Sequence, residues 1–115
     1  MVIGFDLGGS LADLPWLQEF ARHAEKRGDQ IHIATCISRG AEGWTRQVVN
    51  GLGLKTYKMH IHFKTDDLGQ VKSLTERGRE RADILAGLQV DLAFDDHPEI
   101  VDEIRKRGIL AIQCK

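Results

Sequence analysis

The sequence predicts an α/β fold, a Rossmann-like three-layer sandwich in which helices cover both faces of a five-stranded, mostly parallel sheet. Short apolar runs alternate with longer segments whose apolar residues recur every three or four positions, which is the order of right-handed βαβ units. The length of 115 residues is typical of one domain. We therefore expect a single domain over residues 1–115.

The first half of the chain is expected to hold three strands and two helices. The strands cover residues 2–5, 31–36 and 59–63, and the helices cover residues 14–27 and 44–52. Each strand is a mainly apolar run, and each helix carries an apolar stripe that ends near a glycine, Gly28 or Gly51. Trp16 and Trp44 belong to the two stripes, which predicts that both indoles lie in the core.

The second half continues the alternation. Helices are expected at residues 75–88 and 98–107, and strands at residues 91–94 and 109–113. Ala82 and Leu85 lie on the inner face of the first helix, within a charged run that is typical of a solvated helix surface. The last helix is the clearest, because Pro98 begins it, basic residues occupy its last turn and Gly108 follows it.

Composition excludes several classes of partner. Sixteen basic and seventeen acidic side chains give a formal charge of −1, so there is no general basic patch for nucleic acid or an anionic membrane. No apolar run is long enough to span a bilayer. The two cysteines, Cys36 and Cys114, end apolar runs, which is typical of free thiols. We expect a cytoplasmic protein without disulfides.

Polar side chains follow the expected strands at their carboxyl ends, where open α/β sheets bind ligands. These residues are Asp6, Thr35, Cys36, Lys64, Asp95 and Asp96. Two carboxylates from different strands, with a hydroxyl and a cation, suit a hard metal such as Mg²⁺ and a phosphate group. Simpler interpretations stay open. Asp6 could cap a turn, Thr35 could cap the helix that follows it, and Asp95 or Asp96 could cap the helix that begins at Pro98.

The order of these residues resembles the HAD superfamily, the haloacid dehalogenase-like hydrolases, over residues 3–113. The family's first motif is an apolar strand ending in Asp-x-Asp-Gly-[Thr/Ser/Val]-[Leu/Val], and residues 6–11 match it except at Gly8, where the family has its second Asp. The continuation through Asp13 is similar to the nucleotidase-like branch. Thr35 matches the second motif, and the acidic pair Asp95-Asp96 matches the fourth.

The family's third motif is a Lys some fourteen residues before the acidic pair, and Arg81 occupies that position here. Lys64 and Lys72 are the alternatives for this role. The chain has no room for a cap domain, so the resemblance implies a capless member whose substrate is a phosphorylated small molecule or macromolecule.

The resemblance implies a role for each matched residue. Asp6 would be the nucleophile that forms an aspartyl phosphate. Mg²⁺ would be held by Asp6, the Gly8 carbonyl, Asp95 and Asp96. Thr35 and nearby backbone groups of Cys36 and Gly9 would hold phosphate oxygens, with Arg81 or Lys64 offsetting their charge.

Gly8 removes the acid that would protonate the leaving group, a loss of about a hundred- to ten-thousandfold in rate. Two hypotheses follow: a Mg²⁺-dependent phosphohydrolase or phosphotransferase with weak or altered activity, or a catalytically inactive phosphate-binding or protein-interaction module. Residues 3–10 also resemble the phosphate loop of actin-like kinases, but those kinases have two lobes and more than twice this length. His60 and His62 share a strand face without a third metal ligand, which favours exposed histidines over a metal site.

Overall fold

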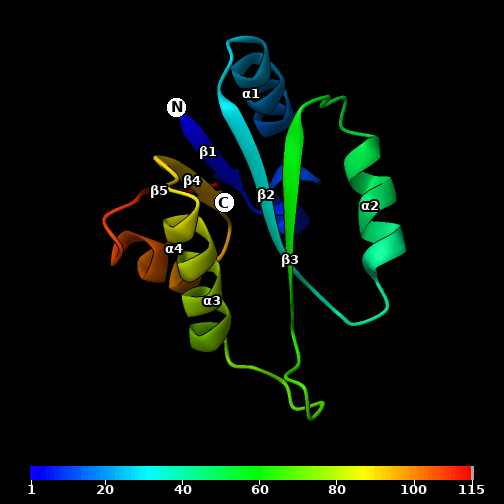
Figure 1. Cartoon of the computed structure of the whole chain (residues 1–115), viewed down its shortest axis with the longest axis vertical. Helices are drawn as coiled ribbons and strands as arrows, with labels where there is room; N and C mark the ends of the chain where they lie inside the picture. Colours follow the sequence, from blue (N-terminus) through cyan, green and yellow to red (C-terminus); the bar gives the residue numbers. More distant parts are fainter. Residues whose placement is uncertain (115) are drawn as a thin grey trace.

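Five parallel strands form the centre of the computed structural model, which describes residues 1–114 (Figure 1). They are β1 (Val2–Phe5), β2 (Gln30–Ile37), β3 (Tyr57–Phe63), β4 (Leu92–Asp95) and β5 (Leu110–Gln113). Their order across the sheet is β3-β2-β1-β4-β5. Every pairing in this sheet is parallel, so the predicted α/β class is confirmed and the sheet is more regular than the mostly parallel one expected.

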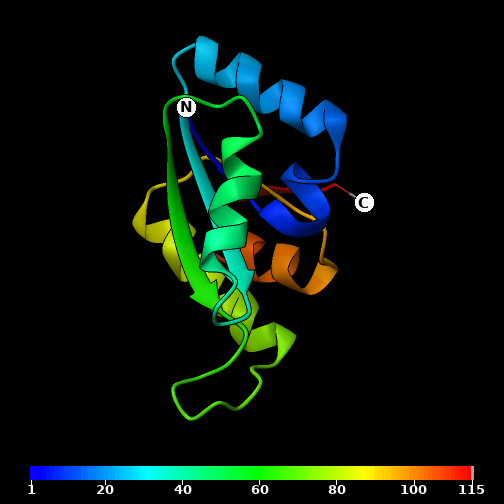
Figure 2. The same cartoon turned by 90° about the vertical axis from the view of Figure 1, so that its right-hand side faces the viewer.

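Four α-helices connect the strands: α1 (Pro15–Lys26), α2 (Glu42–Asn50), α3 (Leu74–Gly87) and α4 (Pro98–Arg105). A short irregular turn, η1 (Leu7–Leu11), follows β1. Figure 2 shows α1 and α3 on opposite faces of the sheet, as expected for a three-layer sandwich. None of the helices in residues 1–114 has the length and apolarity needed to cross a bilayer.

The two faces of the sheet have separate apolar cores. On one face, Phe5 packs with residues of α1 and α2, including Leu17 and Val49. On the other face, residues of α3 and α4 pack together, including Leu85 and Ile104. Successive side chains of a strand point to opposite faces of the sheet. At the end of β1, Phe5 therefore points into the first core, and the residues directly before and after Phe5 face α3.

A glycine on β1 lets α3 lie close to the sheet. A Cβ atom added at Gly4 would lie 2.7 Å from Cδ2 of Leu85, which is closer than real Cβ atoms approach. Gly78 plays the same part between α3 and α4, because a Cβ there would lie 3.3 Å from Cα of Ile100. The close approach brings the residues of α3 on the same stripe as Leu85, including Arg81, over the end of β1.

Candidate functional site

A crevice of about 540 Å³ lies at the carboxyl ends of β1 and β2. Its lining includes eight of the nine residues predicted for the site: Asp6, Gly8, Gly9, Thr35, Cys36, Lys64, Arg81 and Asp96. The ninth, Asp95, lies below the surface and contacts Arg81. The structure therefore brings all nine residues together, whereas Lys72 is engaged elsewhere in an ion pair with Glu80 at 2.9 Å.

Asp6, Asp95 and Asp96 form a carboxylate cluster at the ends of the neighbouring strands β1 and β4. One oxygen from each lies within 4.8 Å of the others. Asp6 and Asp95 are buried, with 7% and 1% exposed area, and Asp96 is partly exposed. The Ser10 hydroxyl lies 3.2 Å from Oδ2 of Asp6 and 3.4 Å from Oδ1 of Asp96, so it can donate to either carboxylate.

Arg81 supplies the positive charge of this cluster. Its Nη1 lies 3.1 Å from Oδ1 of Asp6 and 2.5 Å from Oδ2 of Asp95. The side chain is only 3% exposed, so the interpretation of this run as a solvated helix surface is wrong at Arg81. The reason is its position on the helix: Arg81 lies on the buried stripe that also holds Gly78 and Leu85.

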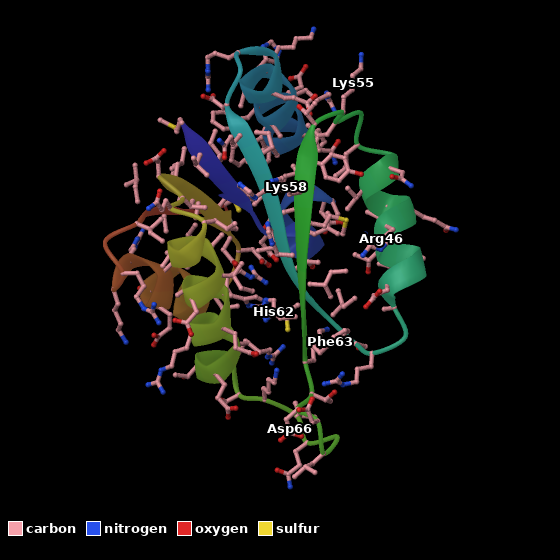
Figure 3. The ribbon with its side chains drawn as sticks, in the orientation of Figure 1. Arg46, Lys55, Lys58, His62, Phe63 and Asp66 are labelled. Atoms are coloured by element: carbon pink, nitrogen blue, oxygen red, sulfur yellow. The ribbon has the colours of Figure 1, made fainter. Side chains whose placement is uncertain are left out.

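His62 holds the other side of the Arg81 guanidinium. Nε of Arg81 donates to Nε2 of His62 at 3.1 Å, so the neutral imidazole carries its proton on Nδ1. Burial, and then the Arg81 charge, lower the pKa of His62 from 6.5 to about 3, which keeps this ring neutral and Nε2 an acceptor. Figure 3 shows His62 on the side of β3 that faces α3.

The expectation that His60 and His62 are exposed is therefore wrong for His62. His62 is buried, and His60 is partly buried with Nε2 3.0 Å from Nδ1 of His32. Only the strand register could have revealed this, because it places His62 beside Cys36 of β2 on the face that α3 covers.

Burial dominates the ionisation of the two inner carboxyl groups. It raises the pKa of Asp6 from 3.8 to about 8; Arg81 lowers this pKa, and the neighbouring carboxylates Asp95 and Asp96 raise it. The pKa of Asp95 is raised for the same first reason, although Arg81 and the His97 backbone N–H oppose the shift. Fully ionised, the three carboxylates would carry more negative charge than one guanidinium neutralises, so the raised pKa of Asp6 keeps a proton on the cluster near neutral pH, and a bound cation would favour the ionised form.

The turn after β1 distinguishes its two glycines. Gly9 has a φ of +74°, and an added Cβ would overlap the Asp96 carboxylate, so only glycine suits this position. Its N–H, which the resemblance assigns to phosphate, donates to Oδ2 of Asp13 at 2.7 Å. Gly8 has a φ of −67° and a ψ of 131°, and an added Cβ would have no atom within 4 Å. The backbone at position 8 therefore suits an aspartate, and the Cβ of that residue would meet no neighbour.

The donor atoms of the site fit Mg²⁺. They are carboxylate oxygens from Asp6, Asp95 and Asp96, with the carbonyl of Gly8 on the same turn, and Mg²⁺ prefers oxygen ligands of this kind. Mg²⁺ would also balance the negative charge that these three carboxylates carry when they are ionised.

No protein-family model matches this sequence, and no curated protein matches it. Solved structures do match the fold. One is a chain of the Pnkp1/Rnl/Hen1 RNA repair complex, with a TM-score of 0.73 and 11% identity over 97% of this chain; the match spans 41% of that longer chain. Another is the D,D-heptose 1.7-bisphosphate phosphatase from B. bronchiseptica complexed with magnesium and phosphate, with a TM-score of 0.64 and 16% identity over 96% of this chain and 78% of that one.

A universal stress protein in complex with cAMP also matches, with a TM-score of 0.58 and 10% identity over 100% of this chain and 98% of that one. At these identities the likeness concerns the fold alone. The fold is the predicted α/β sandwich with a five-stranded parallel sheet, and it is similar to the folds of the RNA repair chain, the phosphatase and the stress protein.

Proposed function

We propose that this protein is a Mg²⁺-dependent phosphohydrolase or phosphotransferase that works through an aspartyl phosphate at Asp6, with weak or altered activity because its general acid is missing. The observation that carries the proposal is the position of Asp6. Its buried carboxylate lies at the end of β1, faces a crevice, and is held by Arg81 beside Asp95 and Asp96. A buried carboxylate is costly unless it has a function or a partner.

Asp6 is oriented for attack by its two neighbours. Arg81 holds Oδ1, which leaves Oδ2, beside the Ser10 hydroxyl, as the attacking oxygen. As Oδ2 forms a bond to phosphorus, the bond from phosphorus to the leaving oxygen breaks and its electron pair departs with the leaving group. Attack by water, or by an acceptor hydroxyl, then releases Asp6 and yields phosphate or a new phosphoester.

A bound Mg²⁺, held by the carboxylate cluster and the Gly8 carbonyl, would stabilise the negative charge that develops on the phosphoryl oxygens. Lys64 and Thr35 line the same crevice, and we expect them to contact those oxygens.

Gly8 determines which substrates can react. With no carboxylic acid at this position, the leaving oxygen departs as an anion, so phosphate esters of acidic alcohols and phenols should react faster than those of ordinary alcohols. Restoring the acid should remove most of this preference.

The test is Mg²⁺-dependent phosphate release from aryl phosphates, sugar phosphates and nucleotides by the native chain, Asp6→Asn and Gly8→Asp. Because the backbone at position 8 suits an aspartate, Gly8→Asp is a matched gain-of-function control. We expect slow release by the native chain, none by Asp6→Asn, and faster release from alkyl phosphates by Gly8→Asp. Native activity that survives Asp6→Asn would contradict the proposal.

The alternative is a catalytically inactive phosphate-binding or protein-interaction module. Gly8 and the ion pair between Asp6 and Arg81 favour it, because that pair satisfies the Asp6 charge without any metal. Silence in all three proteins would support this alternative, and activity in Gly8→Asp alone would mean that the site is intact and its acid chemistry was lost.

A further inference from the structure

An indole forms part of the wall of the crevice. Trp44 lies in the first turn of α2 and is 69% exposed, contrary to the expectation that it lies in the core. Its neighbour Thr45 is buried instead and donates to the Ala41 carbonyl at 2.7 Å. Trp44 lines the same crevice as Asp6, so a large aromatic face is left in contact with water beside the candidate phosphate site.

Two cations in the crevice have no carboxylate partner. Within residues 1–114, neither Lys64 nor Arg77 forms an ion pair, although Lys72 and Arg79 nearby do. Nε of Arg77 is buried and lacks a hydrogen-bond partner. Buried polar groups normally have partners, so this guanidinium has unused hydrogen-bonding capacity at the edge of the site.

Charge balance indicates what these cations would bind. With all three carboxylates of the cluster ionised, the Arg81 guanidinium and one bound Mg²⁺ would balance their charge; the other carboxylate in the crevice lining, Asp13, accepts from the Gly9 N–H. A phosphate dianion added beside them would need two positive charges, and Lys64 and Arg77 supply that number. The crevice therefore suits one phosphate group.

The cations and the indole come from different sides of the crevice. Arg77 is one helical turn before Arg81 on α3, Lys64 follows β3, and Trp44 is on α2. Figure 1 shows α2 and α3 on opposite sides of the ends of β2 and β3. A ligand that meets both sides would carry its phosphate at one end and a flat, apolar group at the other.

We propose that the crevice binds a nucleoside monophosphate, with its base stacked on Trp44 and its phosphate between Lys64 and Arg77. The base supplies the flat aromatic surface that a sugar phosphate lacks, and the ribose separates it from the phosphate. The phosphate position rests on the proposed function, but binding requires no turnover and is tested without it.

The experiment uses tryptophan fluorescence, because the chain has only two tryptophans. Trp16 is 51% exposed, so the expectation that it lies in the core is wrong as well; its ring is 6.5 Å from that of Phe94, and it is not in the crevice lining. Trp16→Phe therefore leaves Trp44 as the single reporter and should not alter binding. This protein is titrated in Mg²⁺ with AMP, UMP, ribose 5-phosphate, phosphotyrosine and inorganic phosphate.

We expect AMP and UMP to quench Trp44 and to bind more tightly than ribose 5-phosphate. Base stacking on an aromatic side chain is worth about 1–3 kcal/mol, which corresponds to about 5- to 150-fold in affinity. Calorimetry with Trp44→Ala should show this loss for AMP and no change for ribose 5-phosphate. Arg77→Ala should weaken both ligands.

Equal affinities for AMP and ribose 5-phosphate, or an equal effect of Trp44→Ala on both, would overturn the proposal. If phosphotyrosine bound as tightly as AMP, the proposal of a nucleotide ligand would be overturned in favour of aryl phosphates in general. If none of the phosphate compounds bound, the proposed binding site itself would be overturned. Binding of AMP without phosphate release would leave this inference standing while the proposed enzyme activity failed.

Discussion

Replacing the proposed nucleophile should make the metal-free protein more stable. Burial raises the pKa of Asp6 to about 8 in the folded chain, against 3.8 for the free side chain. The folded state therefore binds more protons than the unfolded state between these values, and stability is lost as pH rises from about 4 to 8. Asp6→Asn has no such titration, keeps the side-chain size, and should not lose this stability.

The size of the effect follows from the same shift. Each pH unit above the unfolded pKa costs up to about 1.4 kcal/mol, or about 4 kcal/mol by pH 7. Local relaxation and water entry reduce this, so we expect Asp6→Asn to gain about 2–4 kcal/mol at pH 8 and almost nothing at pH 4.5.

The assay is urea unfolding in EDTA across this pH range, for the native chain, Asp6→Asn and the surface control Asp67→Asn. Asp67 is fully exposed and its one ion pair, with Arg39 at 3.5 Å, is a surface pair of little energy, so its variant mainly changes the net charge. Adding Mg²⁺ should raise the stability of the native chain more than that of Asp6→Asn, because the ion binds the ionised cluster. An Asp6→Asn protein no more stable than the native chain at pH 8, or equally stabilised at both pH values, would refute this reasoning.

Three further changes test how the site is held. Arg81→Met should lower the free energy of unfolding in urea by about 3–5 kcal/mol at pH 7, because Asp95 is left buried without its cation. A loss below about 1 kcal/mol would contradict a stabilising role for the ion pair between Arg81 and Asp95. His62→Phe should cost about 1–3 kcal/mol at pH 7 by leaving Nε–H of Arg81 unpaired. The difference in stability should shrink as pH falls below 6.5. In the native chain, His62 then takes up a proton in the unfolded state but not in the folded state, where its pKa is about 3, so the native chain loses stability and the variant does not. A difference that does not change with pH would argue against this. Gly4→Ala should lower the free energy of unfolding in urea by about 1–3 kcal/mol, since its Cβ would lie 2.7 Å from Cδ2 of Leu85 and either this side chain or α3 would have to shift; an unchanged free energy of unfolding would show that Leu85 adjusts at no cost.

The strand and helix order was predictable because it depends on local periodicity. Helix α4 lies at Pro98–Arg105, where Pro98 and the basic last turn predict it, and α3 lies at Leu74–Gly87 within one residue of the expected range. The meeting of Asp6 and Asp95 was predictable for a related reason. Both follow apolar strands, and the carboxyl ends of parallel strands share one edge of a sheet.

The partners of Arg81 and the exposure of Trp44 were not predictable in this way. A charged run on a helix usually faces water, and nothing local indicates that Gly4 lets α3 approach until Arg81 is buried. An apolar stripe likewise indicates which helix face can be buried, but not whether another element covers all of it. Trp44 lies on such a stripe, beyond the part of α2 that packs on the sheet.

By itself, the sequence determined the α/β class, the order of the elements and the acidic residues at the strand ends, since each depends on neighbours along the chain. The tertiary structure alone decided that Arg81 joins Asp6, Asp95 and His62 in one buried network, and that Trp44, Lys64 and Arg77 border one crevice. These contacts join residues from different elements, and their energies depend on burial and distance, which are set only when α2 and α3 pack against the sheet.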